Sequence, residues 1–175
     1  FGEGERYKHD DVLEVQVRVP LVVVPPGEAA AERRTGAASG VDVAPTLLGF
    51  AGIAPSPWMP GVDLTEAPPA EDRIVLVENR DRLREENIRH AVYRGPWKLV
   101  VRGERADGDA ELFDLRTDPL GLTEVSGRHP DVVAELRRAL LDLRESWGAD
   151  EGRAPDWSDG QGLADHLRAL GYGGH

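Results

Sequence analysis

The sequence contains no cysteine among its 175 residues. This absence excludes disulfide bonds, thiolate zinc sites and a cysteine nucleophile within these residues. Long apolar runs are also missing, since none approaches the roughly 18 residues that a membrane-spanning helix needs. We therefore expect no membrane span.

Positive charge is scarce. Lys and Arg number 21 against 32 Asp and Glu, which gives a formal net charge of −11. Proteins bind nucleic-acid backbones through clustered basic side chains, so this balance excludes a general nucleic-acid surface. We interpret the acidity as a solvated, solubilising surface, and we attribute the rarity of lysine, found only as Lys8 and Lys98, to a composition bias of the source.

An apolar, valine-rich run at residues 21–24 predicts a buried strand, bounded by Pro20 and by Pro25-Pro26-Gly27. A strand this apolar belongs in the middle of a sheet, yet few residues precede it in the sequence. We therefore expect the other strands of that sheet to lie upstream of Phe1, so that the chain is a piece of a longer protein.

Two residues compete to cap the helix that follows. With Ser39 as the N-cap, Pro45 would fall in the helix interior, where it removes a hydrogen bond and clashes with the preceding turn. With Asp42 as the N-cap, Pro45 is third in the helix, where its missing N–H is harmless. We therefore choose Asp42 and expect one apolar face, with Gly52 ending the helix. That face comprises Ala44, Leu47, Leu48 and Ala51.

The second half of the sequence predicts a small antiparallel sheet and a long helix. Four short β-rich runs occupy residues 73–78, 88–93, 97–102 and 111–115, and Arg94-Gly95-Pro96 joins the middle two as a hairpin. Residues 131–147 then show a continuous apolar stripe that is typical of a helix packed across a sheet. After a polar linker, residues 163–170 predict a short terminal helix.

The order of the motifs resembles the C-terminal part of the sulfatase family, within the alkaline phosphatase superfamily. The matching segments are Phe1-Gly2-Glu3, Arg18-Val19-Pro20-Leu21, Val41-Asp42-Val43-Ala44-Pro45-Thr46-Leu47-Leu48, Trp97-Lys98-Leu99, Glu111-Leu112-Phe113-Asp114-Leu115 with Asp118-Pro119, and Leu167-Arg168-Ala169-Leu170-Gly171-Tyr172. Each segment alone is weak, and their shared order and spacing carry the resemblance.

The resemblance implies an α/β fold class in two parts. Residues 1–70 would form the last strand and helix of an incomplete, alkaline-phosphatase-like α/β domain. Residues 71–147 would form a small α+β subdomain with a four-stranded antiparallel sheet and a packed helix, and residues 148–175 a linker and short terminal helix.

The resemblance also implies hydrolysis of sulfate esters of a small molecule or glycan. Sulfatases use a formylglycine made from Cys or Ser in a Cys/Ser-x-Pro-x-Arg motif, together with a divalent cation, usually calcium. None of the five serines stands in such a motif. We therefore expect the nucleophile and the calcium ligands upstream, in a missing N-terminal half, no cofactor on this chain alone, and an inactive isolated chain.

Two residues match the family position that stabilises or protonates the leaving oxygen, nine or ten residues before Arg18. His9 and Lys8 both fit this window, and we prefer His9, whose pKa suits proton transfer near neutrality. A solvated loop histidine is the alternative. Arg18 either pairs with Glu14 or Asp11, which would fix the loop carrying His9, or is solvated.

The remaining candidates favour structural roles. His90, His129 and His166 match no motif, and Lys98 is predicted to be an outward-facing strand residue. Two other functions stay open: a non-catalytic remnant or docking module, and a phosphodiesterase or phosphonate hydrolase of the same superfamily.

Overall fold

The computed structural model describes most of the chain between Asp11 and Gly148. The described residues are 11–27, 31–57, 59–66, 68–79, 88–103, 105 and 108–148, with backbone only at 147 and 148. The chain divides into two compact units, residues 1–141 and residues 142–175. Of the second unit, the described part is the last portion of helix α3.

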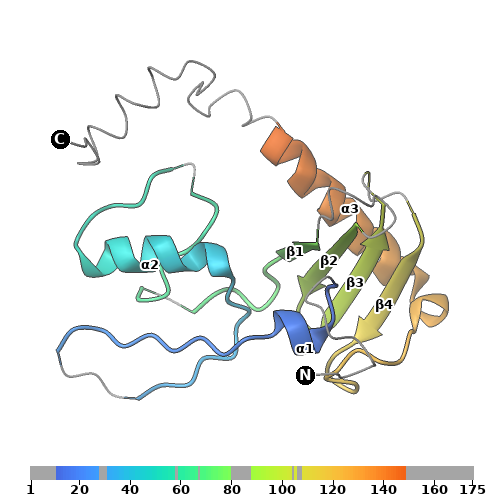
Figure 1. Ribbon diagram of the computed structural model, residues 1–175, viewed down its shortest axis with the longest axis horizontal. Coiled ribbons are helices and arrows are strands. Elements are labelled where there is room, and N and C mark those ends of the chain that lie inside the picture. The colour runs from blue at the N-terminus through green and yellow to red at the C-terminus, as the bar shows by residue number, and fades with distance from the viewer. Residues whose placement is uncertain are drawn as a thin grey trace, which may run out of the picture. The chain divides into compact units, whose positions relative to one another are not determined.

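The first unit contains a four-stranded antiparallel sheet, as the sequence predicts (Figure 1). Its strands follow one another in sequence order, β1-β2-β3-β4. Arg94 pairs with Trp97 across a two-residue turn, in which Gly95 has a φ of 53°. This backbone conformation suits glycine, and it sets the register of the β2–β3 hairpin. The strands are β1 (Val75–Asn79), β2 (Arg89–Arg94), β3 (Trp97–Arg102) and β4 (Ala110–Asp114).

Apolar side chains cover both faces of this sheet. On one face, Leu136 and Leu140 of α3 (Pro130–Gly148) pack with Val92, Leu99 and Leu112. A short 3-10 turn, η4 (Ser126–Arg128), precedes α3. On the other face, Val12 packs against alternate residues of the same strands, Ala91 and Val100. Successive side chains of β2 and β3 point to opposite faces of the sheet, so each of these strands contributes residues to two separate hydrophobic cores.

The helix predicted after Asp42 is present as α2 (Val43–Phe50), preceded by the 3-10 turn η2 (Gly40–Asp42). Asp42 directly precedes α2, as chosen from the sequence, but its backbone is helical, with φ −80° and ψ −16°. Ser39, the alternative cap, caps the 3-10 turn η2, and its amide donates to Asp42 Oδ2 in a capping box. Gly52 has a φ of 67° and ends the helix. The amide of Ile53 donates to Leu48 O and that of Gly52 to Gly49 O, which is a Schellman motif.

The predicted buried strand at residues 21–24 is wrong for this chain. These residues belong to no strand, and the side chains of Val22 and Val24 are 81% and 80% exposed. A strand needs a partner for its backbone N–H and C=O groups, and no described segment pairs with this one.

The residues predicted to share one apolar face lie on α2 and at its C-cap, but this face is largely exposed. Pro45 and Thr46 are buried, whereas Ala44 is exposed and Leu47 is 60% exposed. Thr46 Oγ1 donates to Asp42 O and accepts from the amide of Leu64, so the polar side of the helix faces the chain at residues 61–64. The apolar side of α2 is left uncovered by the described residues.

Candidate functional site

The two predicted catalytic residues, His9 and Lys8, lie outside the described residues, as does His166. The described chain resumes at Asp11, two residues after His9. The amide of Asp11 donates to Gln16 Oε1, and the amide of Val12 donates to Asp11 Oδ1. These local hydrogen bonds join the start of the described chain to helix α1 (Glu14–Val17).

A buried cluster of Glu14, Tyr93 and Lys98 joins this segment to the sheet. The Lys98 ammonium donates to Glu14 Oε1 at 2.8 Å and to the backbone oxygen of Val12 at 2.6 Å. The Tyr93 hydroxyl donates to the same Glu14 oxygen at 2.7 Å. We call these three side chains the Glu14 cluster; its members come from α1, β2 and β3.

Burial dominates the electrostatics of the Glu14 cluster. Lys98 is 3% exposed and Glu14 4% exposed. Burial lowers the pKa of Lys98, against the opposing effect of the Glu14 carboxylate. Burial and the hydrogen bond to Glu14 both raise the pKa of Tyr93, so its hydroxyl stays protonated.

The sequence-based predictions for this region need two corrections. Lys98 does not face outward, because its side chain turns to the buried Glu14 and Val12. Glu14 is held by Lys98 and Tyr93 rather than by Arg18. No local sequence signal marks Lys98, because its partner Glu14 lies 84 residues away in the sequence.

A second buried ion pair joins Asp42 to Arg73. The guanidinium binds the carboxylate through two contacts of 2.7 Å each, and the amides of Ser39 and Val62 also donate to it. Burial acts to raise the pKa of Asp42, but the Arg73 hydrogen bond and the two amides outweigh it and lower this pKa. The pair holds the start of α2 to the segment before β1 and leaves no oxygen of Asp42 without a donor.

The two histidines in the described part of the chain, His90 and His129, contact other residues of the fold. His90 is fully buried on β2, with Nδ1 2.6 Å from Glu78 Oε1 and Nε2 2.9 Å from Gly103 O. The His129 ring lies 4.9 Å from the Trp97 ring, tilted by 54°. Neither is placed to act on a substrate.

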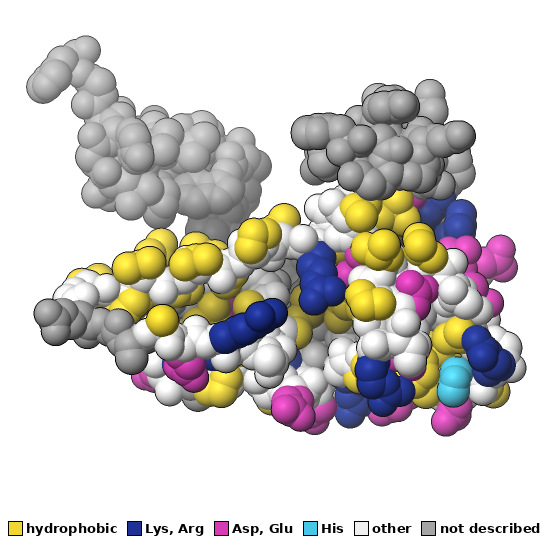
Figure 2. Space-filling model, turned by 90° about the horizontal axis from the view of Figure 1, so that it is seen from below, with side chains coloured by type: hydrophobic (Ala, Val, Ile, Leu, Met, Phe, Trp, Pro, Cys, Tyr) yellow, Lys and Arg dark blue, Asp and Glu magenta, His cyan; other side chains and the backbone are white. Residues whose placement is uncertain are grey.

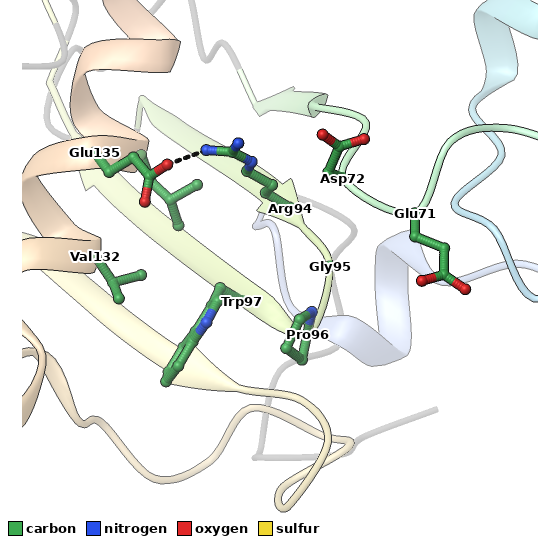
Figure 3. A pocket seen from close by; sticks show the side chains of 9 residues that line it. Glu71, Asp72, Arg94, Gly95, Pro96, Trp97, Val132 and Glu135 are labelled. Atoms are coloured by element: carbon green, nitrogen blue, oxygen red, sulfur yellow. Dashed lines mark hydrogen bonds and ion pairs between the residues drawn. The ribbon is translucent and has the colours of Figure 1, made fainter.

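A cavity of about 330 Å³ lies between the β2–β3 turn and the first turns of α3 (Figure 3). Arg94 projects into it and pairs with Glu135, while Trp97 and Val132 form an apolar wall. Glu71 and Asp72 add negative charge at its edge. Since its one cation is already paired with a carboxylate, this cavity does not suit a sulfate or phosphate ester.

No metal site is evident within the described ranges, where no three His, Asp or Glu side chains come together. In the same part of the chain, no helix combines the length and the apolar character needed to cross a membrane.

Comparison with known proteins identifies relatives of one enzyme class. Arylsulfatase K of Mus musculus is 28% identical over 151 residues, which cover 81% of this chain and 27% of that protein. Choline-sulfatase of Rhizobium meliloti (strain 1021) is 32% identical over 162 residues, which cover 90% of this chain and 29% of that protein. This chain thus spans less than a third of the length of these relatives. No protein-family model matches it.

Among solved structures, the crystal structure of Ps i-CgsB is similar in fold, with a TM-score of 0.50 and 18% identity. The similarity covers 65% of this chain and 24% of that one.

Proposed function

Since this chain is related to sulfatases over most of its length, we propose that it forms the C-terminal part of an enzyme that hydrolyses sulfate esters. The observation that carries the proposal is the similarity to two differently named sulfatases, over 81% and 90% of the chain. The four-stranded sheet with α3, in the order that the family resemblance implies, supports the same assignment.

The exposed apolar surface of the first unit supports a larger parent protein. Val19, Val22 and Val24 are 73%, 81% and 80% exposed, and Leu47 on α2 is 60% exposed. Hydrophobic side chains lie side by side on the face seen in Figure 2. Grouped apolar exposure of this kind marks surfaces that another part of a protein covers. We propose that the remainder of the enzyme covers this one.

The reaction divides between the two parts of the enzyme. Overall, water supplies an oxygen to sulfur, the S–O bond to the alcohol breaks with its electrons going to the alcohol oxygen, and that oxygen takes a proton. We assign the proton to His9, or to Lys8 in its place, because general acids of suitable pKa accelerate such steps by about 10²- to 10⁴-fold. We assign the nucleophile and the calcium ligands to the rest of the enzyme, because this sequence has no cysteine and none of its serines stands in the Cys/Ser-x-Pro-x-Arg motif.

The test uses the protein encoded by the reading frame that contains this chain. We expect it to release sulfate from an aryl sulfate, and the isolated 175-residue chain to release none. Release of phosphate from phosphodiesters or phosphonates, without sulfate, would favour the other branch of the superfamily. Absence of turnover, with tight binding to a separate protein, would favour a docking module.

The leaving group identifies the proton donor. The alkoxide of an alkyl sulfate needs a proton in order to leave, whereas the 4-nitrophenolate of 4-nitrophenyl sulfate leaves without one. His9→Ala is expected to lower kcat on the alkyl ester by about 10²-fold or more and on the aryl ester far less. If Lys8→Ala shows this difference and His9→Ala does not, Lys8 is the donor. A uniform loss on both esters would argue against proton donation by either residue.

A further inference from the structure

We propose that the buried ion pair of Glu14 and Lys98 sets the register in which α1 docks on the sheet. The pair thereby fixes where the exposed apolar segment at residues 19–24 begins, which is part of the surface that the remainder of the enzyme covers. The docking register depends on contacts within the described chain alone, whereas the partner of segment 19–24 rests on the proposed function.

Glu14 itself connects the sheet to segment 19–24. Its carboxylate accepts from Lys98 Nζ at 2.8 Å and from the Tyr93 hydroxyl at 2.7 Å. Its backbone oxygen accepts from the amide of Arg18 at 2.9 Å, which closes α1 at its C-cap. Segment 19–24 begins at the next residue. One residue therefore binds the sheet with its side chain and ends α1 with its carbonyl group.

Helix α1 is too short to set its own position. It has four residues, and its N-cap residue, Leu13, makes no side-chain capping hydrogen bond. A single helical turn is not stable without tertiary contacts. The position of α1 therefore follows from what this part of the chain contacts on the sheet, which is the apolar packing of Val12 and Val17 and the hydrogen bonds of Glu14.

Apolar packing alone does not select one register for this segment. Val12 fills the site against Ala91 and Val100, and Val17 packs at the edge of the same core. Hydrophobic contacts are not directional, so a shifted segment can place another valine at this site with similar burial. The segment offers several side chains of identical shape: Val12, Val15, Val17 and Val19.

The ion pair removes this ambiguity. The Lys98 ammonium is buried and binds two points of the segment at once, Glu14 Oε1 and, at 2.6 Å, the backbone oxygen of Val12. A shift of the segment would separate these partners and leave a buried charge without its counter-ion, which is strongly destabilising. Setting a register is the best-documented role of buried polar groups.

The partner of segment 19–24 follows from its exposure and from the length of the relatives. Val19, Val22 and Val24 are each more than 70% exposed. This chain matches less than a third of the length of the two sulfatases, so most of such an enzyme lies outside it. A fixed starting point at Arg18 lowers the entropy that segment 19–24 loses when the remainder of the enzyme covers it.

Two charge-removing double variants separate register from folding. Glu14→Gln/Lys98→Met removes the buried pair, keeps the side-chain volumes and leaves an acceptor for the Tyr93 hydroxyl. Such replacements often cost little stability. The matched control is Glu111→Gln/Arg102→Met, which makes the same chemical changes in an ion pair that is 39% and 44% exposed.

Spin-label distances on the 175-residue chain test the register. Because the sequence has no cysteine, Val15→Cys on α1 and Leu122→Cys can carry the only two labels, and both native side chains are exposed. We expect one narrow distance distribution in the parent chain and in the control. Glu14→Gln/Lys98→Met is expected to add a second population, displaced by up to about 5 Å, the rise of one helical turn.

Urea denaturation of the same samples shows whether the sheet remains folded. If the double variant is unfolded, the single variant Glu14→Gln replaces it, with the same expected second population. A single, unchanged distance in a folded variant would overturn the proposal. Equal broadening in the control would overturn it too, since the effect would then follow from loss of any ion pair.

Hydrogen exchange in the complete protein tests the consequence for the partner. We expect the amides of residues 21–24 to exchange at least about 10-fold more slowly there than in the 175-residue chain, and Glu14→Gln/Lys98→Met to remove this protection while β2 and β3 stay unchanged. Full protection in the variant would overturn the role in docking. No protection in the unmodified protein would reject the partner, while the spin-label distances still decide the register and sulfate release separately decides the proposed function.

Discussion

Asp42 is a fully buried carboxylate that gathers donors from three segments of the chain. Arg73 binds it through both guanidinium nitrogens, and the amides of Ser39 and Val62 complete its hydrogen bonds. A buried charge is tolerated only with such complete pairing. The start of α2, the chain at residue 62 and the segment before β1 therefore depend on one side chain.

Asp42→Asn tests this dependence. Loss of the charge leaves Arg73 without its carboxylate partner, and we expect the free energy of unfolding to fall by about 3 kcal/mol in urea denaturation. Glu32→Gln, which removes the partner of Arg34 in an exposed ion pair, is expected to change it by less than about 0.5 kcal/mol. Equal effects of the two substitutions would contradict the buried role of Asp42.

The pKa of Asp42 gives the same interaction a pH signature. This pKa is lowered below its usual 3.8 in the folded chain, so the folded state binds fewer protons than the unfolded state in that range. The stability from Asp42 is therefore present above pH 3.8 and lost as pH falls through the folded pKa. The stability difference between the parent chain and Asp42→Asn should be constant above about pH 5 and shrink below it. A difference that does not vary with pH would contradict this account.

Single buried residues were hard to predict because their partners are distant in sequence. Lys98 alternates with apolar neighbours on β3, and this pattern alone favours an outward side chain. Its partner Glu14 is 84 residues away, so burial of the charge follows from the tertiary contact. Local Pro45 chemistry predicted that α2 begins after Asp42, but it did not predict the 3-10 turn that Ser39 caps before it. The pairing of Asp42 with Arg73 spans 31 residues and left no local signal.

At the scale of elements, the sheet and α3 were predictable because their patterns are local and complete. All four strands and the long helix lie within a residue or two of their predicted bounds. The conformation of residues 21–24 was not predictable in the same way. Their apolar composition favours burial, but it does not identify the segment that would cover them. The exposure of the α2 face was not predictable either, because hydrophobic periodicity identifies an apolar face but not the residues that cover it.

Adjacent leucines on α3 offer a matched test of its packing. Leu140 is fully buried against the sheet, whereas Leu141 is 44% exposed. Leu140→Ala is expected to lower the free energy of unfolding by about 2–5 kcal/mol through lost burial and a residual cavity. Leu141→Ala has the same helix propensity change and should cost less than about 1 kcal/mol. Comparable losses in urea denaturation would mean that α3 does not pack on this sheet as described.

At the scale of the whole molecule, the two regions of the first unit differ in how they bury apolar side chains. The sheet has a core on each face, with Leu99 and Leu112 at 0% exposure. Among the residues that the structure describes between 19 and 62, ten large hydrophobic residues are exposed instead: Val19, Leu21, Val22, Val23, Val24, Val41, Val43, Leu47, Ile53 and Val62. An isolated chain should therefore be stable where the sheet is and associate through the other region.

Size-exclusion chromatography with light scattering tests this expectation. We expect the 175-residue chain to associate as its concentration rises, because an exposed apolar segment that belongs to no described strand is a site for intermolecular pairing. Val22 and Val24 are two residues apart and both highly exposed, so Val22→Ser/Val24→Ser should weaken association without changing the unfolding of the sheet. Val100→Ser, which places a hydroxyl in the core beside Val12, should instead destabilise the sheet. A chain that stays monomeric at high concentration, and is unaffected by the Val22 and Val24 substitutions, would show that this apolar surface needs no partner.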